Sequence, residues 1–396
     1  MQVRLYDVRC STELTFRGGT CKHFGSGPGC CKSGLCVFDP HRFGLFPAFP
    51  KQWFTYSLFT DLERLIDHGT NTLRGFEAMQ RSRYDEIIEK CRWSLAGQPY
   101  TLMERSALSV NDEERDAIYE AAWQEGGFKF ILSTFNDIST DRRANDTASE
   151  FIRRKIREIV KDPEVAEKLV PVDHPFTSKR PLIDTDYFET YNRDNVTLVD
   201  IRHSPIVEIT PTGIRTEDAH YELDIIVFAT GFDAMTGTFN RMNIVGRDGQ
   251  LLRDKWAGGP LTYLGVATAG FPNLFMITGP GSPSVLSNMP VSIEQHVEGI
   301  SDLIAHMRAN DIATAEADPQ AEQEWVVHVN EVAAQTMYML ADSWYLGANI
   351  PGKPRVFMPY VGGVGTYREE CAAIAAQGYP GFRMSAPQGT AAAAAQ

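Results

Sequence analysis

The chain has 396 residues and a formal net charge of -13 at pH 7. This acidic balance argues against a nucleic-acid-binding surface or an anionic membrane partner, since both recruit clustered Lys and Arg. Because no apolar run approaches the ~20 residues needed to span a bilayer and the start lacks a signal-like segment, we expect a cytoplasmic protein with a small-molecule partner and no stable membrane association.

The seven cysteines are concentrated near the N-terminus, at positions 10, 21, 30, 31 and 36, with two more at 91 and 371. The adjacent Cys30 and Cys31 fit the paired spacing of a zinc site badly, so we expect no metal site. Residues 1–80 mix Gly, Cys, Phe and Pro without a sustained period, apart from a short strand candidate at Leu35–Phe38. We interpret this region as a composition-biased or damaged N-terminal segment.

Residues 83–170 show a charged, helical pattern. The apolar residues of its clearest part trace one helical face: Phe151, Ile152, Ile156, Ile159 and Val160. Asp162-Pro163 ends this run, because proline cannot continue a helix. The Lys and Arg residues at 153, 154, 155 and 157 are predicted to lie on its solvated face.

From Asn195 to Asp233 the pattern is typical of strands. We expect strands at Val196–Val199, at Ile206–Ile209 and at Ile214–Thr216, the last two joined by a turn at 211–213. In Leu223–Phe228 the apolar residues do not alternate, which predicts a strand buried on both faces of a parallel sheet. The small residues that follow it suit a close approach to a cofactor, although a tight turn after a core strand explains them equally well.

A second buried strand is predicted at Asn273–Ile277, followed by a glycine-rich turn and a helix. The helix is predicted to face the core with an apolar stripe formed by Ile293, Val297, Ile300, Ile304 and Met307. A strand, a glycine-rich turn and a helix together present backbone N–H groups to an anion or a polar ring edge. The tail after Ala386 is low-complexity alanine and is predicted to be disordered.

Four segments carry the most specific information: Thr177–Pro181, Ala229–Asp233, Gly279–Pro290 and Asp342–Lys353. In this order and at these distances they closely resemble the C-terminal two thirds of the Baeyer-Villiger monooxygenases. The resemblance runs from about Arg83 to Phe382.

The resemblance implies an α/β fold. It consists of an incomplete pair of Rossmann-like domains, one for FAD and one for NADPH, with a helical insert. It divides the chain into a divergent remnant of the NADPH-binding domain (1–80), a helical subdomain (81–176), the rest of the NADPH-binding domain (177–232), the C-terminal part of the FAD-binding domain (233–386) and the tail (387–396). It also implies oxygen insertion next to a ketone carbonyl, giving an ester or lactone, with NADPH and O2 as co-substrates.

By the same resemblance Arg180 is the catalytic residue, because a fixed cation beside the flavin favours the anionic oxygenating species and the developing oxyanion. Ser284, Val285 and Leu286 resemble the loop that lines the ketone pocket. Cofactor contacts are implied for Lys179, Thr230, Gly231, Phe232, Asp233, Asn288, Met289 and Trp344. From the residues alone, Arg180 and Lys179 are equally well loop cations before a proline, Met289 core filling and Trp344 a structural tryptophan.

The family uses two G-x-G-x-x-G fingerprints to bind the two pyrophosphates. The nearest approach in this chain is Gly25–Gly29, where the third glycine comes one residue early and a proline intrudes. We therefore expect an N-terminally truncated member, with an exposed sheet edge through which the chain would self-associate. Two rival hypotheses are a flavin monooxygenase acting on nitrogen or sulfur, and a non-catalytic remnant unable to hold FAD.

Overall fold

The computed structural model describes residues 81–387. The strand candidate Leu35–Phe38, the near-fingerprint Gly25–Gly29, the first five cysteines and nearly all of the predicted tail lie outside the described residues. The described chain forms two compact units. The smaller unit holds residues 150–172 and 184–231, and the larger unit holds residues 81–149, 173–183 and 232–387.

The smaller unit joins a helical part to a small antiparallel sheet. It contains the second half of α6 (Arg142–Ile159), α7 (Pro163–Leu169) and the 3-10 helix η2 (Glu189–Asn192). Asp162 caps α7 by accepting hydrogen bonds from the N–H groups of residues 164 and 165, so the chain restarts as a helix directly after the predicted break. The predicted α6 face is confirmed, because Phe151, Ile156 and Val160 are each at most 2% exposed.

The sheet has the strand order β1 (Ile206–Thr210), β2 (Gly213–Thr216) and β3 (His220–Glu222). Ile209 pairs with Ile214, which pairs in turn with Tyr221. The predicted strands at 206–209 and 214–216 and the turn between them are therefore confirmed. Buried Ile214 packs with Ile226 to form the core beneath this sheet.

Two predicted strands of this region are wrong. Val196–Val199 forms no strand; Val196 and Leu198 pack instead against the helical core of the unit. Leu223–Phe228 likewise forms no strand, and Val227 and Phe228 are 42% and 53% exposed. A parallel strand needs neighbours from distant parts of the chain, whereas the Leu223 N–H donates to the Thr212 carbonyl at 2.9 Å and only extends the antiparallel β2–β3 pair.

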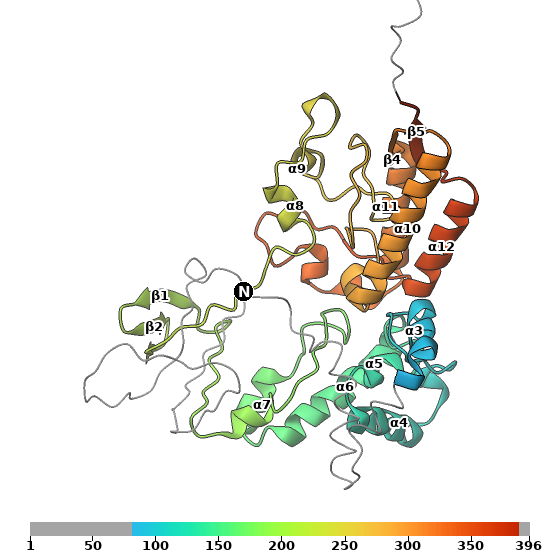
Figure 1. The fold of residues 1–396 in the computed structure, drawn as a ribbon. Helices are drawn as coiled ribbons and strands as arrows, with labels where there is room; N and C mark the ends of the chain where they lie inside the picture. The colour runs from blue at the N-terminus through green and yellow to red at the C-terminus, as the bar shows by residue number, and fades with distance from the viewer. Residues whose placement is uncertain (1–80, 388–396) are drawn as a thin grey trace, which may run out of the picture. The chain divides into compact units, whose positions relative to one another are not determined.

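The larger unit contains the helices α10 (Met289–Ala309), α11 (Pro319–Ala334) and α12 (Val364–Ala376), which lie side by side in Figure 1. At one end β4 (Thr314–Ala317) pairs antiparallel with β5 (Phe382–Ser385). α3 (Tyr84–Trp93) packs on α12, with Cys91, Val291 and Val364 buried together. The main core is aromatic and includes Tyr263, Trp325, Tyr360 and Tyr367.

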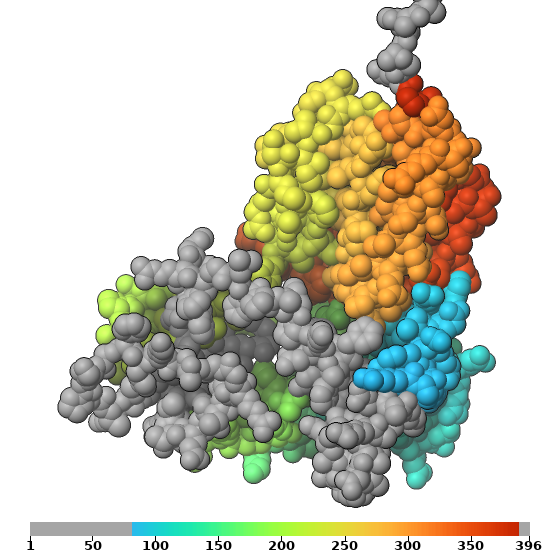
Figure 2. Space-filling model, in the orientation of Figure 1, coloured from blue at the N-terminus to red at the C-terminus, as the bar shows by residue number. Residues whose placement is uncertain are grey.

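The remaining elements complete this unit. They are the α-helices α4 (Asp112–Glu125), α5 (Lys129–Leu132), α8 (Gly237–Arg241) and α9 (Leu252–Lys255), and the 3-10 helices η1 (Ala107–Ser109), η3 (Arg247–Gly249), η4 (Ser284–Leu286), η5 (Met337–Leu340) and η6 (Trp344–Leu346). In Figure 2 the yellow residues around α8 and α9 form one continuous surface with the orange residues of α10 and α11.

A buried ion pair joins α9 to α11. Lys255 and Glu322 are 10% and 6% exposed at their side chains, with Nζ 2.8 Å from Oε2. Thr268 Oγ1 and the Ala269 N–H also donate to Glu322 Oε1, each at 2.8 Å, and Lys255 donates to the Ala269 carbonyl. Because each charge has several partners, the desolvation cost of the pair is largely offset.

Two further predictions in this unit are wrong. Asn273–Ile277 forms no strand; it makes single backbone bonds to Ala315 and Val266, and Ile277 is 41% exposed. The predicted core stripe of α10 is rotated, since Ile293 and Val297 are 39% and 49% exposed. The buried face of α10 carries Val291, Ser292, Gln295, His296, Leu303 and Met307. Among its polar members, Ser292 and His296 have hydrogen-bond partners, whereas Gln295 Oε1 has none among the described residues.

Candidate functional site

The glycine-rich turn before η4 is held at Gly281 by one backbone hydrogen bond and one side-chain hydrogen bond. The Gly281 N–H donates to the Met358 carbonyl at 2.6 Å, and Trp325 Nε1–H donates to the Gly281 carbonyl at 2.9 Å. Gly281 has φ +85°, and a Cβ added there would lie 2.8 Å from Thr262 Oγ1. The position therefore requires glycine, both for its backbone angle and for the close approach.

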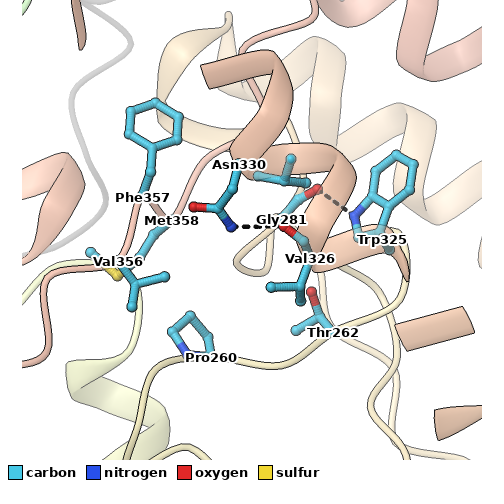
Figure 3. Close-up of a pocket in the computed structure, with 10 residues that line it drawn as sticks. Pro260, Thr262, Gly281, Trp325, Val326, Asn330, Val356, Phe357 and Met358 are labelled. Carbon is cyan, nitrogen blue, oxygen red and sulfur yellow. Dashed lines mark hydrogen bonds between the residues drawn. The ribbon is translucent and has the colours of Figure 1, made fainter. Parts of the chain in front are cut away.

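Figure 3 shows the hollow beside this turn, lined by Gly281, Trp325, Asn330, Phe357 and Met358 among others. Its volume is about 10 Å3, which is room for about one water molecule. A ketone cannot enter it. The hollow is therefore part of the packing behind the turn.

Arg180 lies against η4. Its guanidinium donates a short hydrogen bond to the Val285 carbonyl, and the side chain is half-buried. The neighbouring Ser284 is buried and donates to the Thr278 carbonyl at 3.1 Å. The structure thus brings together the predicted catalytic cation and the predicted pocket residues, which are 105 residues apart in sequence.

Two tyrosines, the buried Tyr345 and the half-buried Tyr338, face the same guanidinium. Burial raises the pKa of the Tyr345 hydroxyl, while the charge and hydrogen bond of Arg180 act in the opposite direction. Burial likewise raises the pKa of Tyr338, and the Arg180 charge again opposes it. The rings of the two tyrosines pack edge to face, with centroids 5.5 Å apart. Among residues 81–387, Arg180 therefore faces neutral acceptors, and no ion pair with a carboxylate cancels its charge within this part of the chain.

The Asp233 turn is tied to the segment after Trp344. Lys353 Nζ lies 2.5 Å from Asp233 Oδ1 and 3.1 Å from the Ala234 carbonyl oxygen, and Asn349 donates to the Phe232 carbonyl at 2.9 Å. The Phe232 side chain is 87% exposed. Phe232 and Asp233 thus lie beside the end of the predicted segment Asp342–Lys353, which is called the Trp344 loop below.

Trp344 opens η6 and is half-buried. Its ring centroid lies 4.4 Å from that of Tyr345, the residue that faces Arg180. Gly347 ends η6 in a left-handed conformation, with φ +72°. The predicted loop therefore connects the Arg180 environment at one end with the Asp233 turn at the other.

The other predicted residues lie in less informative places. Lys179 is half-buried, with Nζ 3.5 Å from Asp173 Oδ2. Asn288 and Met289 begin α10, and the Asn288 N–H donates to the Ala96 carbonyl at 2.8 Å. Thr230 and Gly231 are exposed and end the smaller unit. Their roles stay predictions.

Three buried hydroxyls near these segments have no hydrogen-bond partner among the described residues: Thr177 Oγ1, Thr236 Oγ1 and Ser343 Oγ. Each residue is at most 4% exposed. They precede the Arg180 loop, follow the Asp233 turn and cap η6, respectively. Because buried hydroxyls are normally paired, these groups fit a polar ligand such as the isoalloxazine or nicotinamide end of the two expected cofactors.

Comparison with curated proteins gives strong matches. The chain is 46% identical over 304 residues to a Baeyer-Villiger monooxygenase of Pseudooceanicola batsensis and 43% identical over 304 residues to a cyclohexanone 1,2-monooxygenase of Acinetobacter sp. Each match covers 76% of this chain and 55% of the relative. A phenazine N-monooxygenase of Lysobacter antibioticus is 43% identical over 309 residues, which is 78% of this chain and 56% of the relative.

Solved structures agree. Cyclohexanone monooxygenase from Rhodococcus sp. Phi1 bound to NADP+ superposes with a TM-score of 0.77 at 44% identity, covering 80% of this chain and 59% of that one. An OTEMO complex with FAD and NADP gives a TM-score of 0.76 at 39% identity, over 79% and 58%. These neighbours confirm the predicted fold class.

The fold and the comparisons define the class of flavoprotein monooxygenases built from two Rossmann-type domains. Within that class, over the residues that match, the chain belongs to the Baeyer-Villiger monooxygenase family. No family model matches the chain. The chain spans about 55% of the length of the curated relatives described above.

Sequence reasoning missed several residues of this site. Tyr338, Tyr345 and Lys353 contact predicted site residues, but nothing in their local sequence indicates those partners. The sequence pattern did not indicate that His296 is buried, because it predicted the wrong face of α10 as the core side. Within residues 81–387 there is no group of three or more metal-ligating side chains, and no helix long and apolar enough to cross a membrane.

Proposed function

We propose that this chain contributes the catalytic cation and the ketone pocket of a flavin-dependent monooxygenase, which inserts one oxygen atom of O2 next to a ketone carbonyl to give an ester or lactone. The observation that carries the proposal is the placement of Arg180 against η4, beside the Val285 carbonyl and the side chains of Tyr338 and Tyr345. The family relationship supports the same reaction class.

FAD, when bound and reduced by NADPH, supplies the activation of O2. The residues of this chain supply the surroundings of the reacting ketone. Arg180 holds a permanent positive charge where negative charge develops on the carbonyl oxygen, and its planar fork of donors orients that oxygen. Ser284, Val285 and Leu286 shape the wall against which the ketone rests.

The Trp344 loop excludes water from this region. Trp344, Tyr345 and Leu346 pack over the η4 residues Val285 and Leu286 in one apolar cluster, and a drier site strengthens the interaction between Arg180 and an oxyanion. The unpaired hydroxyls of Thr177, Thr236 and Ser343 would bind polar edges of the cofactors. We assign Lys179 to the NADPH phosphate or ribose, Asn288 and Met289 to the flavin ring edge, and Thr230 to Asp233 to the cofactor-side turn.

A second reaction is favoured by one relative. The phenazine N-monooxygenase is as similar to this chain as the cyclohexanone enzyme, at 43% identity. Oxygenation of an aromatic nitrogen is therefore the alternative reaction for the same site. The two reactions differ in their need for Arg180, because an attacked ring nitrogen develops no carbonyl oxyanion.

We also propose that purified chains self-associate through the exposed apolar residues Val227 and Phe228. Light scattering of the wild type and of a Val227→Lys, Phe228→Lys double variant tests this proposal. We expect the wild type to be larger than a monomer and the variant to be monomeric; a monomeric wild type contradicts the proposal. The cytoplasmic location stays a prediction.

The function is tested by the visible spectrum of the purified chain with added FAD, followed by NADPH and cyclohexanone as a probe ketone. We expect a bound oxidised-flavin band that bleaches with NADPH, and lactone formation in air. A colourless protein after desalting supports the non-catalytic alternative. Flavin turnover that oxidises phenazine but no ketone supports the nitrogen oxygenase.

A further inference from the structure

His296 is a buried histidine that the proposed chemistry does not use. It lies on α10 and is 2% exposed. Its Nδ1 lies 2.8 Å from the Thr278 backbone nitrogen, and its Nε2 lies 3.0 Å from the Tyr367 hydroxyl oxygen. Tyr367, on α12, is 1% exposed.

The proton positions in this cluster follow from its partners. The Tyr367 hydroxyl lies 2.6 Å from the Leu264 carbonyl oxygen, which can only accept. A hydroxyl has one proton, so Tyr367 donates it to Leu264 and accepts from His296. Nε2 of His296 therefore carries a hydrogen, and Nδ1 accepts from the Thr278 N–H. Three hydrogen bonds thus run in one direction, from Thr278 through His296 and Tyr367 to Leu264.

Thr278, the first donor in this series of hydrogen bonds, belongs to the candidate site. Thr278 has φ +53°, a left-handed conformation that is unfavourable for a β-branched residue and needs support from its surroundings. Its carbonyl accepts from Ser284 Oγ at 3.1 Å, and Ser284 begins η4. The next residue, Val285, provides the carbonyl that binds Arg180.

We propose that His296 is a positioning residue, held as the Nε2–H tautomer by Thr278 and Tyr367, which fixes the Thr278 turn and through it the η4 segment that places Arg180. The effect on Arg180 and oxygenation rests on the proposed function. The tautomer of His296 and its hydrogen bond to Thr278 are independent of that function. Loss of the Nδ1 acceptor releases the left-handed turn, and η4 then no longer fixes the Val285 carbonyl.

Two readouts test the inference without any cofactor. Selective 15N labelling of histidine reports the tautomer by two-bond correlations, and hydrogen exchange with mass spectrometry reports the protection of the Thr278 amide. We expect the Nε2–H tautomer in the wild type. In His296→Leu we expect exchange at Thr278 to accelerate about tenfold or more, since one supporting hydrogen bond is lost.

Two further variants separate positioning from general destabilisation. In His296→Asn the Oδ1 atom takes the place of Nδ1, so protection of Thr278 is expected to return toward the wild-type level. Tyr367→Phe is expected to keep the Nε2–H tautomer, because the Thr278 N–H still donates to Nδ1, but to lower the protection of Thr278, since the ring loses the partner that orients it. The matched control is Tyr263→Phe, which also removes a buried hydroxyl donating to a backbone carbonyl, that of Pro380, and is expected to leave Thr278 protected.

With FAD bound, the fraction of NADPH that yields ester is expected to fall in His296→Leu and to recover in His296→Asn, at an unchanged rate of flavin reduction. An Nδ1–H tautomer, or unchanged Thr278 exchange in His296→Leu, overturns the inference even if the enzyme oxygenates ketones. If the tautomer and the Thr278 exchange are as expected but the protein binds no flavin, the hydrogen-bond series is supported. That result contradicts the proposed function instead.

Discussion

Lys353 Nζ lies 2.5 Å from Asp233 Oδ1, across 120 residues of sequence. The two side chains are 12% and 28% exposed, so solvent screens the pair less than it screens a surface ion pair. Because Lys353 also donates to the Ala234 carbonyl, it fixes the end of the Trp344 loop on the predicted cofactor turn.

This relationship predicts measurable coupling between the two residues. In a double-mutant cycle with Lys353→Met and Asp233→Asn, we expect a coupling of about 1–3 kcal/mol in the free energy of unfolding. The matched control is Arg105 with Glu114, a pair of similar length that is 43% and 47% exposed; its coupling is expected to stay below about 1 kcal/mol. Equal coupling in the two cycles would show that the Lys353 pair is an ordinary surface contact.

The Arg180→Ala variant separates oxygenation from flavin reduction. We expect ester formation to fall at least ~100-fold, as when a donor to a developing oxyanion is removed, while NADPH still bleaches the flavin. The comparison is with Arg253→Ala, an exposed arginine of α9, in which both rates are expected to be unchanged. Parallel loss of both rates in Arg180→Ala would assign this arginine to cofactor binding rather than to the oxygenation step.

The elements predicted correctly are those that local sequence determines. The Ile206–Ile209 and Ile214–Thr216 hairpin has its turn residues between its strands, and the α6 face follows a single helical period. Leu223–Phe228 was mispredicted because a parallel strand depends on neighbours from distant sequence. The four site segments were recognised through family resemblance, which located Arg180 but not its tyrosine neighbours.

His296 illustrates a different limit. Because apolar residues are expected on the buried face of a helix, the predicted face of α10 included Ile293, which is exposed, and omitted His296, which is buried. Its burial depends on the Thr278 amide and on Tyr367, which are 18 and 71 residues away. The local sequence pattern around His296 therefore cannot predict these hydrogen bonds.

Burial lowers the pKa of His296 from 6.5 to about 4, which predicts the pH dependence of stability. In the unfolded chain His296 binds a proton below about pH 6.5, whereas in the folded chain it binds one only below about pH 4. The stabilising contribution is therefore complete above pH 6.5 and is lost as the pH falls toward 4, by up to about 3 kcal/mol.

Urea unfolding between pH 7.5 and 4.5 measures this loss, and the imidazole chemical shift of His296 gives the pKa directly. His296→Asn is expected to lose that part of the pH dependence, whereas His203→Asn, at a histidine with an 88% exposed side chain, is expected to retain it. A His296 that titrates near pH 6.5 in the folded protein contradicts the prediction.

The buried pair of Lys255 and Glu322 predicts a large effect of a small change. Glu322→Gln leaves the Lys255 ammonium buried without a countercharge, and we expect a loss of about 3–5 kcal/mol in the free energy of unfolding. Replacing both residues, with Lys255→Met and Glu322→Leu, is expected to cost less. Glu324→Gln, on the exposed side of α11, serves as the control, and a similar loss in both single variants would argue against a role for the buried charge.

The proposed function is tested most directly by turnover under 18O2, with the FAD-loaded chain, NADPH and cyclohexanone, and mass spectrometry of the product. We predict a lactone that contains one 18O atom in wild type and no detectable lactone in Arg180→Ala, with NADPH oxidised in both. Oxidation of NADPH without lactone in the wild type, or a labelled lactone from Arg180→Ala at the wild-type rate, would contradict the account.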